Sequence, residues 1–331
     1  MNQPQLPIID IRPFLVNGNS TQKKDIAHQL HQACCEFGAF YLSGHGINNR
    51  DVLERMRQFF SMSTADKESI AIRKGGFTRG YIGMGAESGS DALEVKEAFS
   101  YGYPWKPGVV PENSLQGENV WPDAGQLPIG WQVAMEDCYQ QFINVAVGLT
   151  KAFSISYGKE EEYLGSYCEG GETISLMRLF HYFPYREADQ HFPLRQDRIG
   201  SSAHTDWGFL TLILQEDGVT GLQLDKDGQW MDVPPMSDTL MVNCGDYFSL
   251  LTGGKYLSPL HRVISEGKER MSAVLFYYPA FDAKIPMLGN QTYSLFKNQV
   301  VAGGEIDATT IVDKAFGEYI REKWEQVQRK D

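Results

Sequence analysis

The chain has 331 residues, of which 42% are hydrophobic and 12% aromatic, so it can bury a large core without disulfides or structural metals. Its formal net charge of −12 argues against a nucleic acid or an anionic membrane as partner, because phosphate-rich surfaces are bound by clustered Lys and Arg. Five Cys residues without a CxxC pair support neither a disulfide framework nor a zinc ribbon, and no run approaches the roughly twenty apolar residues of a membrane span. We expect a cytoplasmic protein with a small-molecule substrate, and a monomer, although the sequence excludes no oligomer.

The first half of the chain contains three stretches with apolar residues at helical spacing. The first runs from Thr21 to Phe37 and is followed by Gly38, which is typical of a helix C-terminus. The others cover about 50–62 and 130–157, and we expect all three helices to brace a sheet from outside. Residues 75–127 are rich in Gly, Pro, Ser and Asn, which predicts long loops over the surface and the mouth of a pocket.

The second half changes to short apolar runs separated by Gly, Pro and Asp-Gly turns. Runs at this spacing predict a jelly roll, or double-stranded β-helix, which like a cupin can hold a ligand between its two sheets. Residues 313–328 are predicted to form a terminal helix, so the fold class is α+β with a mainly β core. The predicted strands are 173–183, 209–215, 221–224, 230–233, 239–243, 261–265 and 271–278.

A His-x-Asp pair is the strongest chemical signal within this region. Residues two apart on a strand face the same side, so His204 and Asp206 are predicted to bind one metal ion. His261 would supply a third ligand. Two His and one carboxylate form the facial set that leaves coordination positions open on Fe(II), which points to catalysis.

An Arg-x-Ser pair follows the last candidate ligand. Arg270 and Ser272 begin a run whose β-branched and aromatic content predicts a buried strand, and the two share a face. A guanidinium stays charged when desolvated and offers parallel donors to a carboxylate. The sequence therefore predicts a site for a dicarboxylate near the metal.

Five further segments accompany these motifs: Leu6–Asp10, Phe37–Ile47, Arg79–Tyr81, Lys96–Phe99 and Arg178–Pro184. With them, the chain resembles the Fe(II)/2-oxoglutarate-dependent dioxygenases of the isopenicillin N synthase-like family over most of its length. The resemblance implies one integrated domain with three parts. These are an N-terminal helical and loop region (1–165), a jelly-roll core (166–285), and a C-terminal segment with a helix (286–331).

The resemblance also implies Fe(II), the cosubstrate 2-oxoglutarate and O2. The expected reaction is hydroxylation or desaturation of a small metabolite, with release of succinate and CO2. In the family's Asn-x-Tyr pattern the tyrosine binds the distal carboxylate of 2-oxoglutarate, and Tyr182 matches it. Phe180 stands where the family has Asn, which predicts a more apolar lining there.

The expected substrate pocket combines strand alternation with the resemblance. Alternation places Arg178 on the same face as Phe180 and Tyr182, and a buried Arg seeks an anion. We expect an internal Asp or Glu in that role, with a substrate carboxylate as the alternative. Trp207 follows the metal-binding Asp, and the resemblance places Phe281, Arg79 and Tyr81 near the pocket. Such a pocket would suit an aromatic or carboxylated small molecule.

Two other functions are compatible with these motifs. One is an oxidase of the same family that uses Fe(II) and O2 without 2-oxoglutarate, as in oxidative cyclisation or ethylene formation. The other is a non-catalytic binding roll that has kept a metal site. Succinate release from 2-oxoglutarate would separate the main hypothesis from both.

Overall fold

The computed structural model describes residues 5–72, 79–86, 94–184, 199–265, 267–285, 300–301, 304–305 and 314–327. Its centre is an eight-stranded sheet with the order β1-β2-β10-β7-β12-β5-β4-β3. These strands are β1 (Ile8–Asp10), β2 (Ala39–Ser43), β3 (Gly80–Ile82), β4 (Lys96–Gly102), β5 (Leu176–Tyr182), β7 (Leu210–Gln215), β10 (Leu240–Cys244) and β12 (Arg270–Tyr277).

A four-stranded sheet with the order β6-β11-β8-β9 forms the second layer. Its strands are β6 (Ile199–His204), β8 (Leu222–Lys226), β9 (Gln229–Asp232) and β11 (His261–Ile264). A two-stranded pair, β13 (Val300–Val301) and β14 (Gly304–Glu305), stands apart from both sheets in hydrogen bonding. The two main sheets form the double-stranded β-helix that the spacing of the apolar runs predicted.

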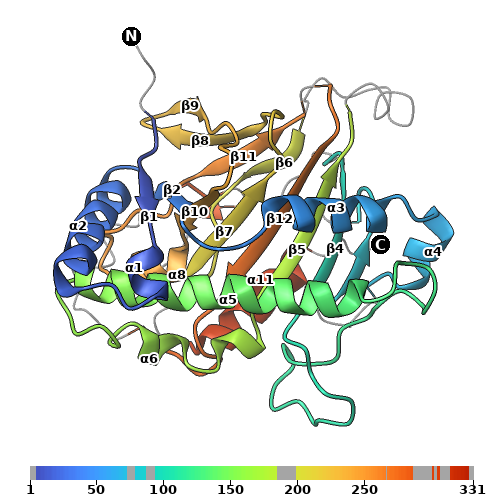
Figure 1. The fold of residues 1–331 in the computed structure, drawn as a ribbon, viewed down its shortest axis with the longest axis horizontal. Helices are drawn as coiled ribbons and strands as arrows, with labels where there is room; N and C mark the ends of the chain where they lie inside the picture. The colour runs from blue at the N-terminus through green and yellow to red at the C-terminus, as the bar shows by residue number, and fades with distance from the viewer. Residues whose placement is uncertain are drawn as a thin grey trace.

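Helices cover the outer face of the large sheet. Figure 1 shows α5 (Trp131–Ser156) lying across its strands, with α2 (Ser20–Glu36) at one end and α3 (Asn49–Phe60) near β12. The remaining helical elements are α1 (Arg12–Leu15), α4 (Thr64–Ser69), α6 (Gly165–Cys168), η1 (Gly171–Thr173), α8 (Asp246–Leu251) and α11 (Phe316–Val327). No helix in these described ranges is both long and apolar enough to cross a bilayer.

Strand alternation divides the buried apolar residues between two cores. On β12, Ala273 and Leu275 belong to the outer core against the helices, whereas Val274 belongs to the inner core between the sheets. The inner core also takes Leu222 and Val263 from the small sheet. Because side chains on a strand point alternately to the two faces, Arg270 and Ser272 face inward with Val274.

The three predicted helices of the first half are confirmed to within a residue or two. Asn19 and Gln22 form a reciprocal capping box at the start of α2, which satisfies backbone N–H groups that the helix leaves free. The predicted stop at Gly38 is also confirmed, since that residue has φ +68°, a conformation in which a side chain is strained.

The prediction of long loops over 75–127 is confirmed for 103–127 but is wrong at two strands. Gly80–Ile82 and Lys96–Gly102 form β3 and β4, which extend the large sheet beyond β5. β4 pairs with β5 and β3 with β4, so long-range hydrogen bonding outweighs the local Gly and Pro content. Helices α4 and α8 are also absent from the predictions. Every residue of α8 is buried, and a helix that is buried all round shows no helical periodicity.

Candidate active site

Two histidines meet where the small sheet ends. His204 is the last residue of β6, His261 is the first of β11, and the two are direct partners in the antiparallel register. Their ring centroids lie 4.3 Å apart. Asp206 Oδ1 lies 3.7 Å from His204 Nε2, and Asp206 Oδ2 lies 3.7 Å from His261 Nε2. The three ligand atoms all lie within 4.8 Å of one another, which a single ion can bridge.

Asp206 lies beside the two histidines as predicted, but the prediction that it shares a strand with His204 is wrong. β6 ends at His204, so His204 and Asp206 do not share one strand. Asp206 lies in the turn after β6, where its backbone carbonyl accepts a hydrogen bond from Asp246 N at 2.7 Å. The turn, rather than strand alternation, brings the carboxylate beside the imidazoles.

Backbone carbonyls fix the tautomer of both imidazoles. His204 Nδ1 lies 2.7 Å from Ser202 O, and His261 Nδ1 lies 3.1 Å from Pro259 O. A carbonyl only accepts, so each Nδ1 carries the proton and each Nε2 keeps a lone pair directed at the carboxylate. This is the form in which imidazole binds a metal.

Burial and nearby polar groups shift the pKa values of His204 and Asp206. Burial lowers the pKa of His204 to about 4, so this imidazole is neutral at pH 7. Burial would raise the pKa of Asp206, but His261, His204 and the hydrogen bonds from Asn243 and Thr211 together lower it. Asn243 Nδ2 donates to Asp206 Oδ2 at 2.8 Å. The site therefore presents a neutral imidazole at His204 and a carboxylate at Asp206.

The start of α8 holds the turn that carries Asp206. Thr205 Oγ1 donates to Asp246 Oδ2 at 3.0 Å, and burial raises the pKa of Asp246 to about 7. Gly245, just before α8, allows the backbone to lie close to Gly208, because a Cβ at Gly245 would lie 2.2 Å from Gly208 O. The carboxylate ligand is thus positioned by backbone contacts that a larger residue would disrupt.

A cavity between the two sheets joins this cluster to the inner face of β12. The space in it, including the open mouth, is about 420 Å³. Its walls are mostly apolar apart from the cluster and β12. The lining residues are Phe180, Tyr182, Ser201, His204, Asp206, Thr211, Ile213, Leu222, His261, Val263, Arg270, Ser272, Val274 and Phe276.

Arg270 is the cation of this cavity and is almost completely buried, with 3% of its surface exposed. Its Nη2 donates to Gln215 Oε1 at 3.0 Å, while Nε and Nη1 have no hydrogen-bond partner within the described ranges. Burial lowers the pKa of Arg270, but a guanidinium remains charged at neutral pH. Two buried, unpartnered donors of a charged group create a strong demand for an anion.

The other two predicted anion-binding residues lie beside Arg270. Tyr182 is its cross-strand partner on β5, and the Arg270 guanidinium carbon lies 4.9 Å from the Tyr182 ring centroid. Ser272 is the cross-strand partner of Phe180, and both residues line the cavity. Phe180 and Tyr182 stack with centroids 6.0 Å apart, so Phe180 gives the cavity an aromatic wall where the family has an amide.

Of the six predicted substrate-pocket residues, Phe180 alone lines the described cavity. Three others gather around α11. Arg178 lies over the ring of Trp324 at 4.4 Å, Trp207 packs edge-on against the same ring at 5.2 Å, and Phe281 lies against Gly317. On α11 the contact of Arg178 is Trp324, and an internal Asp or Glu as the partner of Arg178 stays a prediction.

Arg79 and Tyr81 do not line the described cavity. Arg79 is buried and donates to Leu115 O at 3.0 Å. Tyr81 donates to Glu97 Oε2 and belongs to the core against the helices. Gly80, between them, has φ +127° and begins β3.

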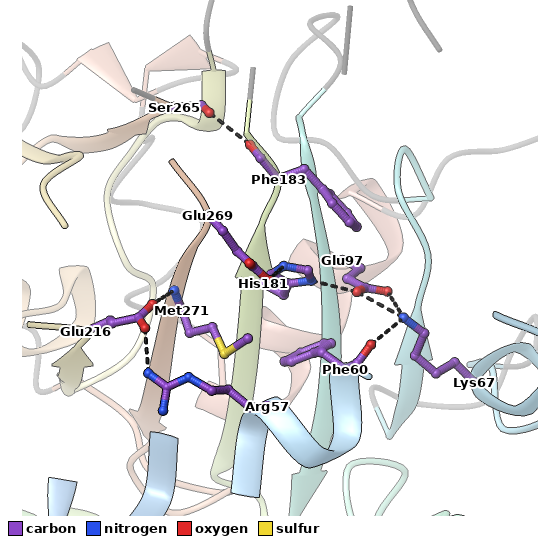
Figure 2. A network of polar contacts seen from close by, with 10 residues as sticks. All are labelled: Arg57, Phe60, Lys67, Glu97, His181, Phe183, Glu216, Ser265, Glu269 and Met271. Atoms are coloured by element: carbon purple, nitrogen blue, oxygen red, sulfur yellow. Dashed lines mark hydrogen bonds and ion pairs between the residues drawn. The ribbon is translucent and has the colours of Figure 1, made fainter. Parts of the chain in front are cut away.

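His181 lies between Phe180 and Tyr182 in the sequence, but its side chain is on the other face of β5, away from the cavity. It follows Phe180 on β5 and therefore points to the outer face, where Nδ1 lies 2.7 Å from Glu97 Oε1 (Figure 2). Lys67 donates to the same carboxylate at 2.7 Å. This buried network links α4, β4 and β5 and gives His181 a structural role.

The sequence analysis did not identify three residues that contribute to the site. Gln215 holds Arg270, Asn243 holds Asp206, and Lys96 Nζ lies 5.3 Å from the Phe180 ring centroid and 3.3 Å from Ser201 Oγ. Asn243 on β10 and Gln215 on β7 are polar residues at or near the ends of mainly apolar strands. That placement was the available signal, because a buried amide needs a polar partner.

Comparisons with known proteins agree with this geometry. A family model described as the 2OG-Fe(II) oxygenase superfamily matches residues 173–279, and one described as the N-terminal region of a non-haem dioxygenase in morphine synthesis matches 6–124. Clavatol oxidase claD of Penicillium crustosum is 33% identical over 92% of this chain and 93% of its own length. Homoarginine-6-hydroxylase 2-ODD-C23 of Glycine max is 31% identical, over 86% of this chain and 88% of its own.

The fold is shared with solved structures. A full-length protein of Neurospora crassa, solved in complex with alpha-KG, has a TM-score of 0.76 at 24% identity, covering 98% of this chain and 97% of that chain. The complex of the same protein with alpha-KG and thymine gives a TM-score of 0.77 at 23% identity, covering 98% of each chain.

Proposed function

Because this chain belongs to the family of Fe(II)/2-oxoglutarate-dependent dioxygenases, we propose that its iron binds to His204, Asp206 and His261. The protein is an enzyme of that family acting on a small metabolite with Fe(II), 2-oxoglutarate and O2. The two Nε2 lone pairs and the Asp206 carboxylate support the iron assignment, since they form the two-His, one-carboxylate set typical of such oxygenases.

We assign the distal carboxylate of 2-oxoglutarate to Arg270, with Ser272 and Tyr182 beside it. The observation that carries this assignment is the pair of buried, unpartnered donors on Arg270 within the cavity that contains the candidate ligands. A carboxylate would satisfy both donors and the charge together. The wall formed by Ile213, Leu222 and Val263 would keep water away from the pair.

When bound together, iron and 2-oxoglutarate supply the oxidising chemistry, in which O2 is reduced and 2-oxoglutarate becomes succinate and CO2. The residues of the chain contribute positions. Ser202 O and Pro259 O keep the Nδ1 protons in place, and Asn243 fixes the orientation of the Asp206 carboxylate. Arg270 would orient the cosubstrate by its far end.

For the substrate, we propose the region next to the described cavity in which Arg178, on the same face of β5 as Phe180, lies together with Trp207 and Trp324. Aromatic rings packed edge-on and a guanidinium suit an aromatic or carboxylated small molecule. Hydroxylation or desaturation of such a molecule is the reaction that we infer. The relatives named as 2-oxoglutarate-dependent favour this over an oxidase that does not use the cosubstrate.

A succinate assay tests the proposal. Purified, iron-loaded enzyme should release succinate slowly from 2-oxoglutarate alone and faster with an aromatic or carboxylated substrate. Stimulation by neutral aliphatic compounds only would contradict the substrate class. Product formation without succinate would contradict the role given to 2-oxoglutarate.

A further inference from the structure

The end of β7 holds the candidate anion-binding arginine by its side chain. Gln215 is buried, and its Oε1 accepts the hydrogen bond from Arg270 Nη2 at 3.0 Å. The other end of the amide is also fixed, because Nε2 donates to Val233 O at 3.3 Å. The oxygen of Gln215 must therefore face the guanidinium, since a reversed amide would set an N–H against an N–H.

The next residue holds the backbone beside Arg270 from the opposite face of the sheet. Glu216 Oε2 accepts from Met271 N at 2.9 Å, and Glu216 N donates to Met271 O at 3.2 Å. Arg57 of α3 donates to Glu216 Oε1 at 2.6 Å, so the carboxylate already has a cationic partner (Figure 2). Gln215 and Glu216 together fix both the side chain and the backbone position of Arg270.

The chemical difference between these two neighbours matters for anion binding. The residue that touches Arg270 in the cavity is a neutral amide, and the acidic residue lies on the far face with its own arginine. A neutral acceptor orients the guanidinium without cancelling its charge, and it uses one donor while Nε and Nη1 stay available.

We propose that Gln215 is a positioning residue for 2-oxoglutarate, orienting Arg270 while leaving its charge for the distal carboxylate of the cosubstrate. This inference rests on the proposed role of Arg270. It predicts that a carboxylate in place of the amide would compete with the cosubstrate for the guanidinium. Gln215→Glu changes little in size, so its effect should be electrostatic.

The chain offers a matched control in the small sheet. Gln223 Oε1 accepts a hydrogen bond from Arg262 Nε at 2.8 Å, and neither residue lines the cavity. Gln223→Glu therefore makes the same chemical change beside another arginine. Calorimetric titration of 2-oxoglutarate into the Mn(II)-loaded protein measures binding without turnover. 2-Oxovalerate, which has a methyl group where 2-oxoglutarate has its distal carboxylate, serves as the second probe.

We expect Gln215→Glu to weaken 2-oxoglutarate binding about 10- to 100-fold, as expected for a hydrogen bond to a charged group. Binding of 2-oxovalerate should change by less than about twofold, as should 2-oxoglutarate binding to Gln223→Glu. In turnover, KM for 2-oxoglutarate should rise while kcat at saturation is kept. Gln215→Leu should weaken 2-oxoglutarate binding selectively as well, which provides a second test if the Glu variant does not fold.

Two results would overturn the inference. Equal weakening of both 2-oxo acids would indicate general damage to the cavity. Wild-type affinity for 2-oxoglutarate in both Gln215 variants would remove Gln215 from this role. In the latter case, weaker binding by Arg270→Leu would leave the proposed function standing, whereas unchanged binding by that variant would refute both proposals.

Discussion

Replacing Arg270 with Leu removes the cation from the cavity while keeping an apolar side chain of moderate size. In the wild type, Arg270 is 3% exposed, has one hydrogen bond to Gln215, and keeps two donors without partners in the described part of the chain. Losing one partner of a buried, hydrogen-bonded charge pair costs about 2–5 kcal/mol. This corresponds to an increase of roughly 30-fold to several-thousand-fold in the 2-oxoglutarate concentration needed for half-saturation.

Succinate release measured against 2-oxoglutarate concentration is the assay, with calorimetric binding as a second readout. Arg262→Leu is the control, because Arg262 stacks on Trp230 at 4.1 Å in the small sheet and does not line the cavity. A titration of Arg270→Leu within about threefold of the wild type would refute the reasoning. A loss of folding, seen by circular dichroism, would instead require Arg270→Gln, for which the same direction is expected.

Three further changes test the surroundings of the site. Asn243→Ala should weaken Fe(II) binding about 10- to 100-fold in an anaerobic titration, because Asp206 loses the partner that orients it; wild-type affinity would contradict this. Gly245→Ala should lower the melting temperature and the metal affinity together, since its Cβ would lie 2.2 Å from Gly208 O, and an unchanged value of either would argue against the close approach. Glu97→Gln should lower the free energy of unfolding by about 3–5 kcal/mol at pH 7, because the buried Lys67 loses its partner. As a control, Asp51→Asn in the more exposed pair with Arg55 should lower it by less than about 1 kcal/mol. Burial raises the pKa of Glu97, but hydrogen bonds from His181, Lys67 and Tyr81 lower it below 4.5. Its stabilisation is therefore present above pH 4.5 and is lost as the pH falls through the folded pKa. A Glu97→Gln penalty that grows as the pH is lowered below 4.5 would contradict this sign.

The parts of the fold with regular patterns were predictable from the sequence. Helices such as α2 carry their own signals in apolar spacing and caps, and β7 and β12 are apolar runs bounded by turns. β6 was not among the predicted strands, since Ile199–His204 is rich in Gly and Ser. It forms because β11 offers a hydrogen-bonding partner, and that is information from a distant part of the chain.

The candidate site divides in the same way. His204, Asp206 and His261 stood out because their side chains have few other reasons to occur in that order with an Arg-x-Ser pair. The residues that orient them did not, because the hydrogen bonds of Asn243 and Gln215 depend on strand pairing. The pocket assignments of Arg79 and Tyr81 came from resemblance alone, and the hydrogen bonds of these residues to Leu115 and Glu97 lie outside the described cavity.

Crystals of the enzyme grown with Mn(II) and 2-oxoglutarate, measured for anomalous scattering, test the central claim most directly. We predict one metal peak within bonding distance of His204 Nε2, His261 Nε2 and the Asp206 carboxylate, with the distal carboxylate of 2-oxoglutarate on Arg270. A metal bound away from these three side chains, or a cosubstrate whose far carboxylate avoids Arg270, would contradict the account.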